Sequence, residues 1–235
     1  QTALNFDVTN SEINYRGQKR SDYNMSVGQS ELATGQLYYN AKYPLSDVTS
    51  VYSFGGVSFR NGKSYAFNRL PNGSGTFTQV YENGFLPEIE SDILDASAAV
   101  GVTTQLFGFD TDISSNLGTN SFKYGVNNTI NATLGTASPS SFDAGKVSFL
   151  QSTTNLDLTK KFDVLQGLNV AFGGEFRYEN YQIKAGEEAS YGLYDVNGDL
   201  VSGTLPTTSP LIVTDFFGNK RGAGAQGFSG FQPAD

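Results

Sequence analysis

Strict alternation of apolar and polar residues over positions 168–178 constrains the fold of this chain more than any other feature. The two sets are Leu168, Val170, Phe172, Phe176 and Tyr178 on one side and Asn169, Ala171, Gly173, Glu175 and Arg177 on the other. A β-strand with this pattern presents one face to an apolar medium and the other to water. The segment therefore suits the wall of a transmembrane β-barrel, with lipid outside and a hydrated lumen inside.

The same period-two pattern recurs along the chain and predicts six antiparallel strands. We expect them over about 35–43, 48–59, 93–106, 109–121, 149–162 and 168–183. One face should carry Leu94, Ala98, Val100, Val102, Leu150, Leu156, Leu158, Leu168, Val170, Phe172 and Phe176, and the opposite face Asp95, Asn155, Asp157, Glu175 and Arg177. In the second strand Val51, Val57 and Phe59 mix with Tyr52 and Phe54, so alternation leaves its apolar face open.

The connections between these strands alternate between short and long. Segments 44–47, 107–108 and 163–167 are short, whereas 60–92, 122–147 and 184–235 are long and rich in Gly, Asn, Ser and Pro. This alternation places the short turns at one end and the long loops at the other, as in transmembrane barrels. The alternative is a soluble sandwich or solenoid, although soluble folds usually have brief connections at both ends.

Composition excludes several function classes. The formal net charge is −8, from 15 basic and 23 acidic residues, and no basic cluster stands out, so nucleic-acid binding is not expected. The chain has no Cys and no His, which removes disulfides, thiolate sites, the usual zinc sites and histidine-based acid–base catalysis. We expect no enzyme activity, no catalytic residue, no metal and no cofactor. No apolar run is long enough for a helical membrane span.

Eight short motifs, in order along the chain, resemble the barrel domain of TonB-dependent outer-membrane receptors. They are Asn24-Met-Ser-Val-Gly-Gln-Ser30, Gly35-Gln-Leu-Tyr-Tyr-Asn40, Tyr52-Ser-Phe-Gly-Gly-Val-Ser-Phe-Arg60, Asn83-Gly-Phe-Leu-Pro-Glu88, Thr153-Thr-Asn-Leu-Asp157, Phe172-Gly-Gly-Glu-Phe-Arg177, Ala185-Gly-Glu-Glu-Ala-Ser-Tyr191 and Gly224-Ala-Gln-Gly-Phe228. The resemblance extends over nearly the whole chain.

That family combines a plug domain, which contacts TonB, with a barrel of about 22 strands. The resemblance implies energised transport of a scarce nutrient, such as a siderophore or glycan, across the bacterial outer membrane. It implies as partners the remaining barrel and plug, the TonB complex through that plug, outer-membrane lipid, and a small-molecule or oligosaccharide substrate. Residues 1–235 are expected to form a partial barrel domain without a plug, because six strands are fewer than the roughly 8 of the smallest bacterial barrels.

Two groups of residues are candidate substrate contacts. Glu175, Arg177 and Glu179 share the inward face of the last strand. They can contact a substrate or the plug, or form an ordinary charged ladder of a hydrated wall. Tyr191 and Tyr194 belong to the aromatic residues that crowd the loops. Their rings can stack on a sugar or siderophore, or pack the loops against one another.

Two other features have structural interpretations that we favour over functional ones. Asp110 and Asp112 are paired carboxylates near a turn, where a solvated role is expected rather than acid–base work or cation binding. Segment 195–199 resembles the start of a calcium loop, but its Gly198 is misplaced and Asn197-Gly198 predicts a hairpin turn. Two rival functions stay open: a surface barrel or adhesin without transport, and a soluble secreted β-protein that binds glycans.

Overall fold

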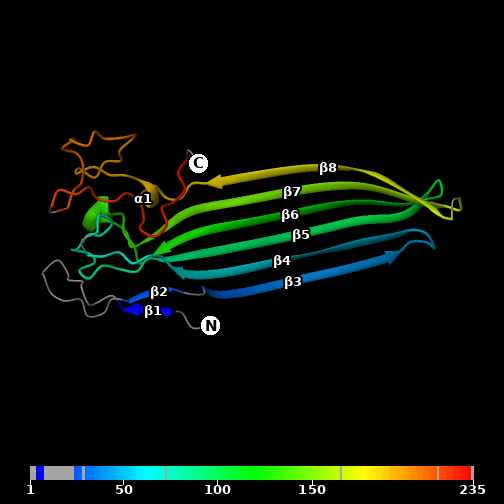
Figure 1. Ribbon diagram of the computed structural model, residues 1–235, viewed down its shortest axis with the longest axis horizontal. Coiled ribbons are helices and arrows are strands. Elements are labelled where there is room, and N and C mark those ends of the chain that lie inside the picture. The colour runs from blue at the N-terminus through cyan, green and yellow to red at the C-terminus, as the bar shows by residue number, and fades with distance from the viewer. Residues whose placement is uncertain are drawn as a thin grey trace.

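The computed structural model is an elongated antiparallel sheet with a cap of loops at one end (Figure 1). It describes residues 4–7, 24–27, 30–71, 73–164, 166–215 and 217–233, with the backbone alone for the first two ranges. Six strands pair in chain order: β3 (Glu31–Pro44), β4 (Ser50–Tyr65), β5 (Glu88–Leu106), β6 (Phe109–Asn127), β7 (Ser141–Phe162) and β8 (Leu168–Lys184). Two further strands, β1 (Leu4–Asp7) and β2 (Asn24–Val27), form a separate two-stranded sheet that the alternation did not predict.

The three short connections lie together at one end of the sheet, and the long ones lie at the other (Figure 1). This confirms the predicted meander and its alternation of turns and loops. The tightest turn is Phe107-Gly108, where both residues have positive φ, 53° and 76°. Those angles match the two-residue hairpin turn whose twist fits the flanking strands.

The strands extend further toward the loop end than the sequence predicts. β5 begins at Glu88 rather than about residue 93, and β7 begins at Ser141 rather than about residue 149. In these extensions the apolar residues lie on the opposite face from those of the band, as Ile89 of β5 and Phe142 of β7 do. The alternation that predicts the strands therefore does not continue into them. The ladder continues because each added residue has a partner, such as Glu88 opposite Asn127.

Strand register divides the sheet into two faces. The apolar face includes Leu37, Tyr39, Val57, Phe59, Leu94, Val100, Ile113, Leu117, Leu156, Phe172 and Phe176. The polar face includes Asn40, Ser58, Asp95, Asp112, Asn116, Asn155, Asp157, Glu175 and Arg177. The predicted grouping of residues is confirmed, and the pairing Val51–Val102 assigns the ambiguous strand β4.

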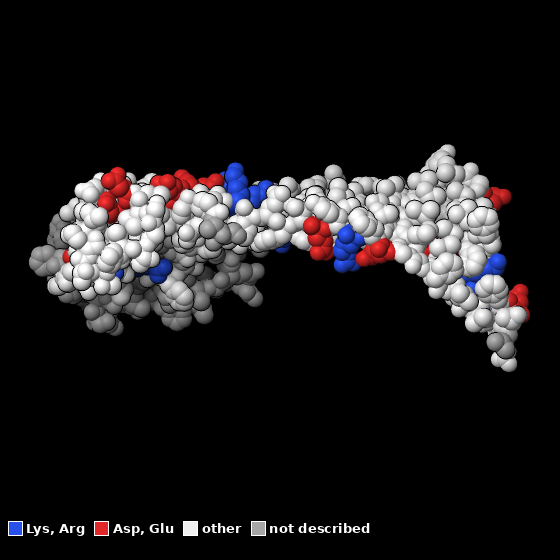
Figure 2. All heavy atoms as spheres, turned by 90° about the horizontal axis from the view of Figure 1, so that it is seen from above, with Lys and Arg blue, Asp and Glu red and all other residues white. Residues whose placement is uncertain are grey.

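Charge is absent from a wide band of the apolar face. Along the described strands, this face carries no Asp, Glu, Lys or Arg between the register row of Lys146 and that of Lys160. Apolar and hydroxyl side chains fill the band, with Asn180 and Gln182 at its loop end. In Figure 2, charged atoms gather at the two ends of the molecule and in one group partway along.

The sheet is open. Among the described residues, β3 and β8 are edges that do not pair with each other, so the six strands do not close into a barrel. Large apolar side chains are exposed on the apolar face, including Leu37 at 71% and Phe176 at 71%. Within the described part of the chain, no helix is both long and apolar enough to cross a bilayer.

Most of the buried core lies in the cap and at the loop ends of β6 and β7, which the cap covers. The cap comprises the described parts of 66–87, 128–140 and 185–233, including a short 3-10 helix, η1 (Ala132–Ala137), and α1 (Glu188–Tyr191). One cluster joins Val126, Phe142, Ala144 and Ala225; another joins Phe85, Ile130 and Ala132. Phe228 stacks on Tyr124 at 4.7 Å between ring centroids, so the last loop covers the polar face where β6 ends.

Tyrosine rings lie over glycines of neighbouring strands at three places. Tyr38 covers Gly56 on the polar face, Tyr39 approaches Gly55 on the apolar face, and Tyr52 covers Gly101. A Cβ added at Gly56 or Gly101 would lie 2.1 or 2.3 Å from the ring. The rings therefore fill the space that the missing side chains leave, a known way to support glycine in a sheet.

Candidate functional site

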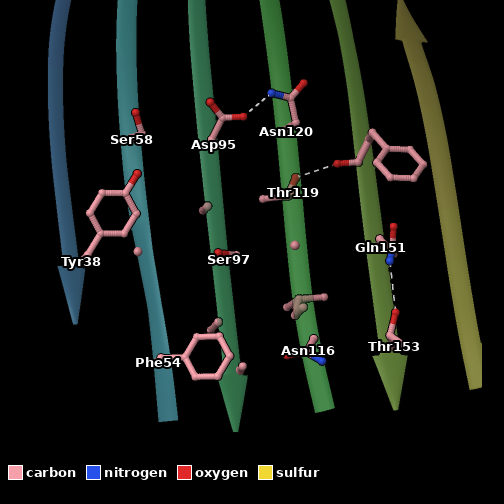
Figure 3. A pocket seen from close by; sticks show the side chains of 17 residues that line it. Tyr38, Phe54, Ser58, Asp95, Ser97, Asn116, Thr119, Asn120, Gln151 and Thr153 are labelled. Atoms are coloured by element: carbon pink, nitrogen blue, oxygen red, sulfur yellow. Dashed lines mark hydrogen bonds between the residues drawn. The ribbon is translucent and has the colours of Figure 1, made fainter. Parts of the chain in front are cut away.

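A groove crosses the polar face midway along the strands. Its hollow has a volume of about 440 Å³ and is lined by five strands, β3 to β7. Figure 3 shows side chains from these strands around it. They include Tyr38, Phe54, Ser58, Asp95, Ser97, Asn116, Asn120, Gln151 and Thr153. The sequence analysis identified none of these residues as a site.

Small residues form the floor of the groove, and larger ones form its walls. Ser97 and Gly118 are direct cross-strand partners, and a Cβ at Gly118 would have no atom within 4 Å. Tyr38 of β3 and Phe54 of β4 stand on one side of the groove (Figure 3). Phe149 comes from β7, at the other side in the strand order. The groove exists because small side chains on neighbouring strands coincide in register.

Amides and hydroxyls supply most of the polar atoms of the groove. Asp95 accepts hydrogen bonds from Arg60 at 2.9 Å and from the side-chain amide of Asn120, so its charge is already compensated. Gln151 donates to the hydroxyl of Thr153 at 3.2 Å. Such a surface, with aromatic rings beside neutral hydrogen-bonding groups, suits a polar and largely uncharged ligand.

The predicted ladder on β8 continues the groove. Gln151 pairs in register with Glu179, and Thr153 pairs with Arg177. Arg177 forms an ion pair of 2.9 Å with Glu175 and lies 3.9 Å from Glu179. All three side chains are about half exposed on the polar face. The structure thus brings the ladder together and places it beside the groove.

Tyr191 and Tyr194 lie in the cap, beyond the end of β8. Tyr194 is 8% exposed, and its hydroxyl donates a hydrogen bond of 3.0 Å to the Glu188 carboxylate. Its backbone N–H donates one of 3.1 Å to the hydroxyl oxygen of Thr133. Burial, reinforced by the Glu188 carboxylate, raises the pKa of Tyr194 to about 12. Its contacts are those of a residue that packs the loops together.

Asp110 and Asp112 occupy the turn end of the polar face. Asp110 accepts a hydrogen bond of 2.9 Å from Gln105, and Asp112 accepts one of 2.9 Å from the Tyr52 hydroxyl. Asp157 is the direct cross-strand partner of Asp112. Among the described residues, no three or more His, Cys, Asp or Glu side chains are grouped as metal ligands.

Two hairpin turns of the cap are built on aspartate. Asp195 accepts from the backbone N–H groups of Asn197 at 2.8 Å and Asp199 at 3.1 Å. Asp215 repeats this arrangement with Phe217 at 2.9 Å and Asn219 at 2.8 Å. The hairpin predicted at Asn197-Gly198 is therefore confirmed, closed by the bridge between Tyr194 and Leu200.

These turns predict an acid-sensitive cap. The pKa of Asp195 is lowered mainly by the hydrogen bond from the backbone N–H of Asp199. The pKa of Asp215 is lowered mainly by the hydrogen bond from the side chain of Asn219. Because the pKa of each carboxyl is lower in the folded chain than its ordinary value of 3.8, the ionised carboxylates stabilise the turns at pH values above 3.8. This stabilisation is lost as the pH falls through the folded-state pKa. Hydrogen-exchange protection of the four donor amides should therefore decrease in acid.

Asparagine variants provide the control for this prediction. Asp195→Asn and Asp215→Asn keep a side-chain oxygen that accepts the same hydrogen bonds but cannot be protonated in this range. Protection in the double variant should not change with pH in acid. If hydrogen-exchange protection decreases in acid equally in the variant and in the unmodified protein, these two carboxylates have no such role.

Comparisons with known proteins give no assignment: no family model, curated protein or solved structure matches this chain.

Proposed function

We propose that this chain forms part of the wall and outer loops of an outer-membrane, TonB-dependent receptor that imports a scarce nutrient. The observation that supports this most directly is the separation of charge between the two sheet faces. Between the row of Lys146 and that of Lys160, the charged side chains of the sheet all lie on the polar face. A soluble sheet has no reason to keep one exposed, largely apolar face free of charge over such a width.

The width of the charge-free band fits a bilayer. From Lys146 to Lys160, β7 advances fourteen residues. At about 3.3 Å per residue this is about 46 Å along the strand. With a strand tilt of about 40°, the band is about 35 Å high along the membrane normal. It is therefore tall enough to span a hydrocarbon core of about 30 Å, with the two lysine rows just outside it. Lys160, which lies 5.1 Å from the Phe109 ring centroid and 5.3 Å from that of Phe162, then marks the turn-side interface.

In this orientation the polar face lines a lumen, and the groove lies at mid-depth in it. Thr153 and Asn116, a register pair at the turn-side end of the groove, are midway between the two lysine rows. The neutral amides and the three aromatic rings of the groove favour an oligosaccharide among the nutrients imported by such receptors. The proposal includes no enzymatic step, because the groove offers binding groups rather than an activated nucleophile.

Filling the groove tests this function. Gly118→Phe adds a ring where a Cβ meets no atom, so the sheet should still form. Because the ring occupies the hollow, uptake of the natural nutrient should decrease by at least about tenfold, equivalent to about 1.4 kcal/mol of lost binding. The measurement is growth of the natural host on a panel of limiting oligosaccharides and iron chelates.

Gly174→Phe is the matched control. Gly174 has equally open space but pairs with Leu156 on the apolar face, where a ring would meet lipid. It should leave uptake unchanged. If Gly118→Phe also supports normal growth on every nutrient, the groove does not lie on a transport path.

A further inference from the structure

Three lysines form one transverse row at the loop-side border of the apolar face. Lys123 of β6 is the direct partner of Lys146 of β7, which is in turn the direct partner of Lys184 of β8. Toward β4 the row continues with Asp92 and Asn61, which hydrogen-bond to each other at 2.8 Å. Cation follows cation across three adjacent strands.

This row lacks enough negative charge from the protein itself. Lys123 pairs with Asp143 at 3.1 Å, and both side chains are about half exposed. Within the residues that the structure describes, Lys146 and Lys184 form no ion pair. Directly opposed residues lie about 4.5–5.5 Å apart between Cα atoms, and like charges in that relation destabilise a sheet. An anion bound across the row removes this repulsion.

The position of the row indicates which anion it meets. The lysines begin where the charge-free band ends, so in a bilayer their ammonium groups lie at the level of the lipid head groups. Their flexible stems can lie along the apolar surface while the charges reach the interface. The opposite border differs, because there Lys160 lies between the rings of Phe109 and Phe162.

We propose that Lys123, Lys146 and Lys184 bind the phosphate groups of anionic lipids in the leaflet on the loop side. Each ammonium provides three donors and a compact charge, which suits a phosphate with several acceptor oxygens. Basic side chains at a membrane surface attract anionic lipids in this way. This inference rests on the proposed function, because it requires the apolar face to be in a bilayer.

Lipid selectivity tests the inference. The protein, expressed from its full reading frame, is placed in phosphatidylcholine nanodiscs doped with spin-labelled phosphatidic acid or spin-labelled phosphatidylcholine. Electron paramagnetic resonance measures the motionally restricted fraction of each label. We expect phosphatidic acid to be preferred, and its relative association constant to decrease about fivefold for each lysine removed in K123Q/K146Q/K184Q.

Two further variants control for charge. K42Q/K161Q/K220Q removes the same number of charges from the polar face and the cap and should retain the preference. Arginine at the three row positions, in K123R/K146R/K184R, should also retain it, because arginine too pairs with phosphate.

The outcomes separate the two proposals. If neither label is restricted, the apolar face does not meet lipid, and the proposed function is overturned together with this inference. If phosphatidylcholine is restricted but phosphatidic acid is not preferred, or if its preference survives in K123Q/K146Q/K184Q, only the lysine site is overturned. Loss of the preference on adding inorganic phosphate, at constant ionic strength, would assign the row to free phosphate and would also overturn the head-group site.

Discussion

Leu117→Arg is expected to prevent stable membrane assembly, whereas Asn116→Arg is expected to be tolerated. The two residues are sequence neighbours at mid-depth of the charge-free band but lie on opposite faces of β6. An arginine at the bilayer midplane costs about 2–4 kcal/mol, equivalent to about 30- to 800-fold in a folding equilibrium. On the polar face the same guanidinium stays hydrated. Urea titrations of the protein expressed from its full reading frame, folding into phospholipid vesicles, measure the difference.

Leu117→Ala separates the charge from the loss of the leucine side chain. Leu117 is 52% exposed within the sheet, so truncation leaves no sealed cavity and should have a small effect. If Leu117→Arg and Asn116→Arg fold equally well, the apolar face does not meet lipid. Such a result would favour the soluble glycan-binding alternative over a membrane wall.

The second large effect concerns the 235-residue chain on its own, which we expect to self-associate in detergent-free buffer. β3 and β8 each have one edge without a strand partner within the described sheet, and the apolar face exposes many large side chains. Unpaired strand edges template pairing with other chains, and in lipid each unpaired backbone group costs several kcal/mol. Sedimentation velocity should therefore show heterogeneous assemblies rather than one small species.

A detergent that covers the apolar face provides the control for that experiment. It should reduce the assembly size without creating a cooperative monomer, because it cannot supply hydrogen bonds to the edges of β3 and β8. A monomer that melts cooperatively in plain buffer would instead show that the chain has a sufficient core of its own.

The sequence predicts the turn ends of the strands well because local chemistry determines them. Phe107-Gly108 adopts two positive φ angles, and the neighbouring Leu106 and Phe109 already follow the alternation of the band. At the loop ends the apolar residues change face, as Ile89 and Phe142 show. The extensions from Glu88 and Ser141 therefore do not continue the alternation that predicts the rest of each strand.

The candidate site was only partly predictable for a different reason. Glu175, Arg177 and Glu179 are neighbours along one strand, so their shared face follows from spacing alone. The groove instead depends on register across five strands, which brings Tyr38 and Gln151 to one hollow. Its sequence signal, small residues at Ser97 and Gly118, becomes meaningful only when they are known to be partners.

The cap shows the same limit at longer range. The hydroxyl of Thr129 donates to the carbonyl of Gln226 at 2.7 Å, and the amide of Asn131 donates to that of Gly192 at 2.8 Å. These bonds join loops that no hydrophobic period connects. By composition alone, the segments of the cap are polar and irregular loops. In the structure they pack against one another around a buried core that includes Ile130.

The tyrosine rings laid over glycine have a consequence for the hydrated side of the sheet. A glycine on the polar face leaves its peptide groups open to water, which competes for the interstrand hydrogen bonds. By covering Gly56 and Gly101, Tyr38 and Tyr52 keep solvent away from the backbone at these two positions. The tyrosine and the glycine of each pair therefore constrain each other. Replacing the tyrosine alone uncovers the backbone, and replacing the glycine alone displaces the ring. Natural variants should therefore change both positions together.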